Sequence, residues 1–98
     1  MSIQNYRLHW QGIEIEARYE ARFSLGTVAN LVIESIHPAR AKLPITETGF
    51  RSHFHTAGMI EAEYGGDVIK AVTAWLDKEA KSKAWKDHVK ATRQYELF

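Results

Sequence analysis

The sequence predicts an α+β fold, in which an N-terminal antiparallel β-meander of three to four strands is followed by two C-terminal helices packed on one face. Three observations support this prediction. Polar and apolar residues alternate on both sides of Gln11-Gly12, residues 28–36 are rich in β-branched side chains, and an apolar stripe with helical spacing follows Asp67. Ninety-eight residues is the size of one folding unit, so we expect residues 1–98 to form a single domain.

The first two strands are predicted from residues 6–10 and 13–19, joined by a two-residue turn with glycine in second place. This turn fixes which residues face each other across the hairpin. The pairs on the core face are Trp10 with Ile13, Leu8 with Ile15 and Tyr6 with Ala17, and those on the outer face are His9 with Glu14, Arg7 with Glu16 and Asn5 with Arg18. Because a slip of one residue would bury the carboxylates, the register is strongly specified.

Residues 28–36 are predicted to form a third, central strand that ends before His37-Pro38, and residues 20–27 to form the connection leading to it. From residue 39 to residue 55 the pattern loses clear periodicity. This predicts a long loop, although residues 49–54 could also form a short edge strand. Because function is often carried by ordered loops, this segment is a candidate binding region.

The C-terminal half is predicted to be helical. Residues 59–64 are ambiguous between a strand and a helical turn, whereas Asp67 is a favourable N-cap for the helix that follows it. A single rod would carry the later apolar stripe to a different side, so we expect a break near residues 81–83, with Ser82 capping a second helix. The tryptophans are assigned to packing: Trp10 on the hairpin, and Trp75 and Trp85 in the helical stripes.

Composition limits the classes of function. The net charge is +1, which implies no strong attraction to nucleic acid, and the absence of cysteine excludes disulfides, thiol catalysis and cysteine zinc sites. The longest apolar stretch falls far short of the ~20 residues of a membrane span. Because the N-terminus has neither the basic nor the apolar region of a secretory signal, we expect a cytoplasmic protein.

The sequence contains no recognisable catalytic or nucleotide-binding motif. The carboxylate pairs Glu14/Glu16 and Glu61/Glu63 are the usual product of strand alternation, and Gly65-Gly66 lacks the frame of a phosphate-binding loop. The serines are not set in the frame of an activated nucleophile. We therefore expect a protein without enzymatic activity that uses no cofactor.

A candidate loop site surrounds the histidines at positions 53 and 55. In a strand these two side chains would point the same way and could share a metal, with His9, His37 or Glu47 completing the site. The spacing fixes no third ligand, so we assign no metal, and loop histidines commonly hydrogen-bond to backbone or water instead. A metal or small anion bound here would contact Thr46, Glu47, Arg51, Ser52, His53 and His55.

A basic segment near the C-terminus is an alternative binding surface. Nucleic acid would contact Lys81, Lys83, Lys86, Lys90 and Arg93. The other interpretation is that these lysines form the solvated face of a helix, where the helix dipole favours positive charge near the C-terminus.

The last five residues read Gln94-Tyr95-Glu96-Leu97-Phe98 and place two large apolar side chains at the end of a helix. Such a pair needs a partner, which is either the domain's own core or another protein. The pentapeptide resembles the linear motif by which bacterial replication and repair proteins bind the polymerase sliding clamp. The match lies at Gln94, Glu96, Leu97 and Phe98, and Tyr95 departs from it because the preferred residue there is leucine.

A second resemblance covers roughly residues 28–98. The run LPITETGFRSHF at residues 43–54, followed by Ala74-Trp75-Leu76-Asp77, is similar to a group of small uncharacterised alphaproteobacterial proteins from plasmids and other mobile elements. That resemblance implies that the protein belongs to a plasmid or another mobile element, and it carries no established activity.

These observations favour a non-enzymatic interaction protein that docks a replication or repair partner such as the sliding clamp. Gln94, Tyr95, Leu97 and Phe98 would form the contact. The alternatives are a small inhibitor or ligand-binding protein acting through the loop at residues 46–55, or a weak nucleic-acid binder acting through the helix at residues 78–93.

Overall fold

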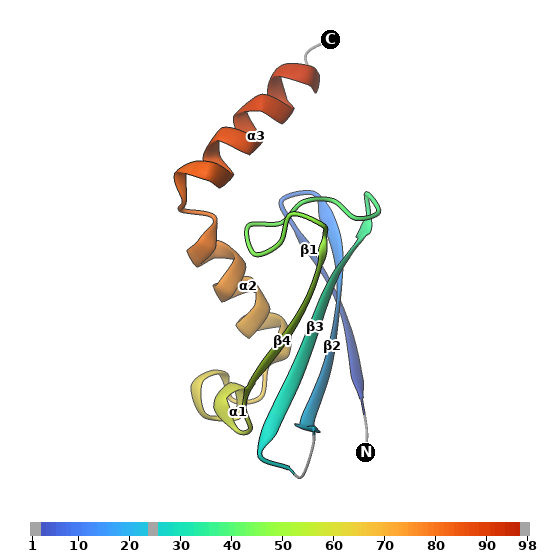
Figure 1. Ribbon diagram of the computed structural model, residues 1–98, viewed down its shortest axis with the longest axis vertical. Helices are drawn as coiled ribbons and strands as arrows, with labels where there is room; N and C mark the ends of the chain where they lie inside the picture. The colour runs from blue at the N-terminus through green and yellow to red at the C-terminus, as the bar shows by residue number, and fades with distance from the viewer. Residues whose placement is uncertain (1–2, 24–25, 97–98) are drawn as a thin grey trace.

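The computed structural model describes residues 3–23 and 26–96, and the side chains within these ranges apart from that of Phe23 and those of residues 92–96. Four strands come first: β1 (Gln4–Trp10), β2 (Ile13–Phe23), β3 (Val28–His37) and β4 (Phe50–Thr56). Three helices follow: α1 (Met59–Tyr64), α2 (Val68–Glu79) and α3 (Lys83–Glu96). The strands are antiparallel neighbours in the order β1-β2-β3-β4, so the predicted α+β meander is confirmed (Figure 1).

The first hairpin has the register that the sequence predicts, because all six expected pairs are present. Gln11 and Gly12 have φ values of 47° and 79°, the positive values that a two-residue turn of type I′ requires. On the outer face the Arg7 guanidinium lies 2.7 Å from a Glu14 carboxylate oxygen and 3.4 Å from one of Glu16. Complementary charges therefore support the register from the side opposite the core.

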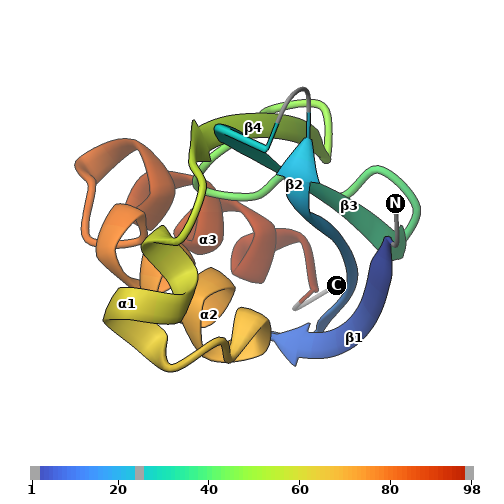
Figure 2. The same ribbon diagram turned by 90° about the horizontal axis from the view of Figure 1, so that it is seen from below.

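Strand β2 is longer than the sequence suggested, because residues 20–23 continue the strand rather than beginning a connection. Ala21 is partly buried against the core, so the inward alternation continues past Tyr19. The pairing with β3 shifts between Glu14 and Ile15 and again between Glu20 and Phe23. Such irregularities increase the local twist, and the sheet curves around the helices in Figure 2.

The segment predicted as a long loop divides into a loop and a strand. Residues 50–56 form β4, which pairs with β3 and lies at the edge of the sheet, so β3 is internal as expected. The ambiguous residues 59–64 form the short helix α1, which makes three helices rather than two. Gly58 and Gly65, with φ values of 93° and 61°, bound this helix and limit it to six residues.

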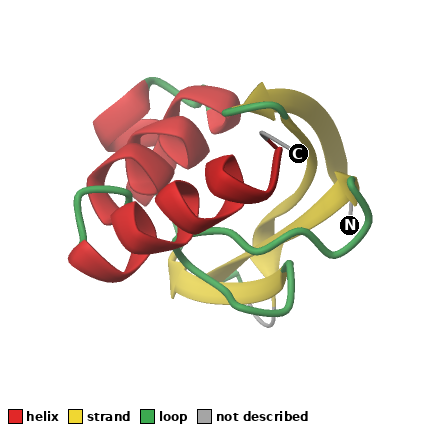
Figure 3. Cartoon of the chain, turned by 90° about the horizontal axis from the view of Figure 1, so that it is seen from above, coloured by secondary structure: helices red, strands yellow, loops and turns green. Residues whose placement is uncertain are grey.

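The core lies between the concave face of the sheet and the helices (Figure 3). Leu43 and Ile45 from the loop before β4 are buried in it and close one end of the sheet. Its members are Leu8, Trp10, Ile15, Ala17, Tyr19, Ala29, Leu31, Ile33, Leu43, Ile45, Ile60, Val68, Ala71, Val72, Leu76 and Trp85. Trp75 is partly buried at the margin, so all three tryptophans take part in packing.

Both predicted N-caps are present. The Asp67 carboxylate accepts a 3.0 Å hydrogen bond from the Lys70 N–H, and the Ser82 hydroxyl accepts one of 3.2 Å from the Trp85 N–H. Helix α2 therefore ends before Ser82 and α3 begins in a new direction, which carries it past the end of the sheet (Figure 1). Within the described residues, no helix has the length and apolar character needed to cross a membrane.

The indole of Trp10 ties β1 to α2 by donating a 2.8 Å hydrogen bond from Nε1 to Oδ1 of Asp77. We expect Asp77→Ala to lower the free energy of unfolding by about 1–3 kcal/mol, because it leaves a buried N–H without an acceptor. Urea denaturation measures the change. The control is Asp87→Ala, whose carboxylate is 62% exposed in its ion pair with Lys83, and which should cost less than about 0.5 kcal/mol. Equal losses in the two variants would contradict the expectation.

Candidate functional site

The six residues of the predicted loop site lie on three different surfaces. Thr46 and Glu47 belong to the loop that precedes β4, whereas Arg51, His53 and His55 share the inner face of β4, opposite Ile33, Leu31 and Ala29 of β3. Ser52 lies on the outer face, where its hydroxyl accepts a 3.1 Å hydrogen bond from the Asn30 amide. The structure therefore brings together the two histidines and Arg51, and not the whole set.

The inner face of β4 carries a continuous row of stacked side chains. Trp75 of α2 lies between the Arg51 guanidinium, 5.6 Å from its ring centroid, and the His53 ring, 4.8 Å away. His53 stacks on His55 at 5.5 Å, and His55 stacks on Tyr19 of β2 at 6.2 Å with the ring planes 4° apart. We call these five residues, Arg51, Trp75, His53, His55 and Tyr19, the inner row.

Tyr19 joins the inner row to helix α1. Its hydroxyl donates to the two carboxylate oxygens of Glu61, at 3.1 and 3.0 Å. Burial, the hydrogen bond to Glu61 and the charge of that carboxylate raise the pKa of Tyr19 to about 12. The phenol therefore remains a donor throughout the physiological pH range.

Burial dominates the electrostatics of the two histidines. It lowers the pKa of His53, and the Arg51 charge lowers it further. Burial and the neighbouring His53 also lower the pKa of His55, whereas Glu61 acts in the opposite direction. Both imidazoles are thus biased toward the neutral form, in which a histidine can ligate a metal. Among residues 3–23 and 26–96, however, no group of three or more potential ligands is close enough to hold an ion, and we assign no metal here.

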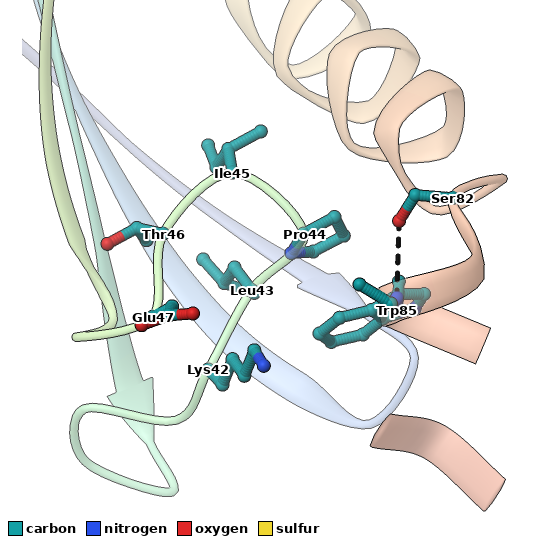
Figure 4. Close-up of a pocket in the computed structure, with 9 residues that line it drawn as sticks. Lys42, Leu43, Pro44, Ile45, Thr46, Glu47, Ser82 and Trp85 are labelled. Atoms are coloured by element: carbon teal, nitrogen blue, oxygen red, sulfur yellow. Dashed lines mark hydrogen bonds between the residues drawn. The ribbon is translucent and has the colours of Figure 1, made fainter. Parts of the chain in front are cut away.

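The other loop residues line a small pocket at the opposite end of β4. Its volume is about 270 Å³, and Glu47 and Lys42 lie side by side along the loop wall, with Trp85 facing them from α3 (Figure 4). The Thr46 hydroxyl donates a 2.9 Å hydrogen bond to the Phe50 carbonyl, and Arg51 Nη1 donates one of 3.0 Å to the Ile45 carbonyl. Thr46 and Arg51 therefore hold the loop in shape.

Sequence reasoning missed Tyr19, Trp75 and Glu61 as neighbours of the histidines, and Lys42 and Trp85 as neighbours of Glu47. These contacts join residues from different elements, so local spacing gives no signal for them. The alternation around Tyr19 shows only that the side chain faces inward, and the helical stripe shows the same for Trp75.

The cations of the predicted nucleic-acid surface lie on α3, except Lys81, which lies in the turn just before it. Lys81, Lys83, Lys86 and Lys90 are exposed, and Lys83 pairs with Asp87 one helical turn later at 2.8 Å. The side chain of Arg93 lies outside the described part of the chain. This arrangement fits a solvated helix face as well as a weak polyanion-binding surface.

The C-terminal peptide lies largely outside the described part of the chain. The backbone of α3 is helical through Glu96, but the side chains of Gln94 and Tyr95 are not described, and neither are Leu97 and Phe98. The structure does place the helix α3, at whose end the peptide lies. Trp85 and Val89 anchor this helix to the core, and the helix extends beyond the sheet (Figure 1). The molecule is therefore elongated, with a longest dimension of 51 Å.

These features define a small α+β domain with a curved four-stranded meander and a projecting last helix. A family model described as the KlcB third domain matches residues 3–85, and the chain belongs to this family. The family places it among plasmid-associated proteins. The match covers all four strands, α1 and α2, and ends at Trp85, the residue that anchors α3. No significant match was found among curated proteins or solved structures.

Proposed function

We propose that this plasmid-associated domain is an interaction protein that docks a replication or repair partner, most specifically the bacterial sliding clamp, through residues 94–98. The observation that carries the proposal is the course of α3. Trp85 fixes the start of the helix in the core, and the helix then runs past the sheet, so that its last residues lead away from the domain (Figure 1). This course of the helix supports docking through its end.

The chemistry of the peptide suits an apolar pocket with a polar rim. Leu97 and Phe98 would be the anchors, and the Gln94 amide offers both a donor and an acceptor. The matched family region ends at Trp85, so the peptide belongs to the segment beyond it. The exposed lysines of α3 would add a salt-dependent contribution to the association rate.

The decisive experiment measures binding of the full chain to purified sliding clamp by calorimetry. We expect the double variant Leu97→Ala/Phe98→Ala to weaken binding by about 2 kcal/mol or more, because buried anchors dominate such interfaces. The melting temperature of this variant should stay close to that of the parent. Tyr95→Leu restores the preferred residue of the motif and should tighten binding.

A matched control separates peptide recognition from charge. Lys86→Ala/Lys90→Ala removes two exposed cations from the same helix and leaves the peptide intact. It should change the salt dependence of binding and preserve most of the affinity at moderate salt. If the anchor variant binds the clamp as tightly as the parent does, the proposal fails. If the lysine variant alone loses binding, the contact is electrostatic.

A further inference from the structure

His55 of the inner row is half-buried, and its ring nitrogens are enclosed in a way that the proposed function does not explain. Both ring nitrogens, Nδ1 and Nε2, are shielded from solvent and have no hydrogen-bond partner among the described residues. A neutral imidazole carries one donor and one acceptor, and leaving both unsatisfied in an interior is costly. The ring is held instead by stacking between His53 and Tyr19.

The groups around the two histidines come from five elements. Strand β2 contributes Tyr19, β4 contributes His53 and Arg51, α1 contributes Glu61, and β3 places the uncharged Ala29 opposite. Helix α2 adds Trp75, an uncharged ring that covers His53. In this set Glu61 is the one anion, and its carboxylate already accepts both contacts from the Tyr19 hydroxyl.

Helix α1 is attached to the sheet at few points. It has six residues, it lies between Gly58 and the Gly65-Gly66 pair, and all three glycines have positive φ. Ile60 is its buried residue, and the bond from Tyr19 to Glu61 is its polar link to β2. A short helix held by Ile60, by the partly buried Tyr64 and by this polar link is sensitive to changes at the end of β4 that precedes it.

We propose that His55 and His53 form an acid-sensitive latch, which holds α1 on the sheet while both imidazoles are neutral and releases it when they become charged. A charged His55 carries two N–H donors that its enclosed position leaves without acceptors, and the attraction of Glu61 offsets only part of this cost. Repulsion between the stacked imidazoles and from Arg51 loosens the end of β4, from which α1 follows after two residues. The helix then separates from β2.

The direction of the pH effect follows from the environment of the two rings. Burial lowers the pKa of both histidines below the ordinary value of 6.5, so the folded protein favours their neutral form. The stability that this provides is fully present above pH 6.5 and is lost as the pH falls toward the lower pKa of the folded state. Because Tyr19 has a pKa raised to about 12, it does not titrate in this window.

Amide hydrogen exchange of the full chain tests the latch. Between about pH 7.5 and about pH 5.5, after correction for intrinsic exchange, protection of residues 59–64 should fall about ten-fold or more, whereas the centre of β2 and β3 should change much less. In His55→Phe the stacked ring is kept and both unsatisfied nitrogens are removed. That variant should melt several degrees higher than the parent near neutral pH and lose most of the pH dependence of α1.

Two further variants make the outcome unambiguous. His9→Gln removes an exposed histidine from the outer face of β1 and should leave the pH profile of α1 unchanged. His55→Gln, whose side chain is polar and neutral, should also flatten the pH profile of α1 protection. This variant replaces His55→Phe in the experiment if the phenylalanine variant fails to fold. The proposal is overturned if α1 protection is independent of pH in the parent, or if it falls equally in the parent and in a folded His55 variant. Neither result depends on the C-terminal peptide or the clamp.

Discussion

Gly49→Ala is expected to destabilise the domain by about 3 kcal/mol or more, because two separate penalties combine at this position. The residue has φ of +76°, in the left-handed region that side chains disfavour. A Cβ atom would also lie 2.5 Å from the carbonyl carbon and 2.7 Å from the Cα and the oxygen of Arg40. These are backbone atoms, so rotation of a side chain cannot relieve the clash.

The position of Gly49 directly before β4 means that the clash would also disturb the pairing of β4 with β3. The Gly49 carbonyl accepts a 2.8 Å hydrogen bond from the Ser35 N–H just before β4 begins. Moving the backbone away from Arg40 would strain this bond and the first pairs between β3 and β4. We therefore expect the loss to appear in both the urea midpoint and the melting temperature.

Gly12→Ala is the matched control for this prediction. Gly12 has nearly the same φ, +79°, but beyond its own and the two adjacent residues no atom lies within 4 Å of the position that its Cβ would take. This variant should cost only about 1–2 kcal/mol, the penalty of the left-handed conformation alone. The difference between the two variants measures the clash with Arg40, and equal losses would show that this contact relaxes freely.

Trp85→Ala is expected to cost about 3–5 kcal/mol and to release α3 from the domain. The side chain is 5% exposed, and its ring lies 5.5 Å from that of Trp10 and 5.1 Å from that of His88. Among the side chains of α3 that the structure describes, removing it leaves Val89 as the apolar contact with the core. A helix of 14 residues is only marginally stable alone, so much of α3 should unfold.

Circular dichroism and urea denaturation together measure the two effects of this substitution. The helical signal should decrease while the signal of the sheet persists. Lys86→Ala, one residue further along the same helix and exposed, should leave both quantities within about 0.5 kcal/mol of the parent. A Trp85→Ala variant with full helical signal and near-parent stability would show that another contact holds α3.

The parts of the fold that were predictable from sequence are those governed by local rules. The hairpin register follows from alternation around Gln11-Gly12, and the helix boundaries follow from the caps at Asp67 and Ser82. The prediction of a connection at residues 20–23 is wrong, because the inward alternation of the strand continues through Ala21. The helix at residues 59–64 was ambiguous because six residues are too few to establish a period.

The candidate site was less predictable, because the physical neighbours of each residue come from other elements. The pair His53 and His55 was recognised, but burial against Trp75 and Tyr19 determines its chemistry, and those contacts span 22 and 36 positions of the chain. The loop residues Leu43 and Ile45 looked irregular in sequence because their role is to fill one end of a curved sheet. Neither kind of contact has a local periodicity.

The contact between Trp10 and Trp85 also gives the protein an internal optical reporter. Two indoles whose centroids lie 5.5 Å apart, with their planes inclined by 42°, couple electronically and produce a chiral signal that isolated indoles lack. One ring belongs to the sheet and the other to α3, so the signal depends on their relative orientation. A partner that tilts α3 would therefore change the spectrum of the unlabelled protein, and its binding could be followed without attaching any dye near the C-terminal peptide.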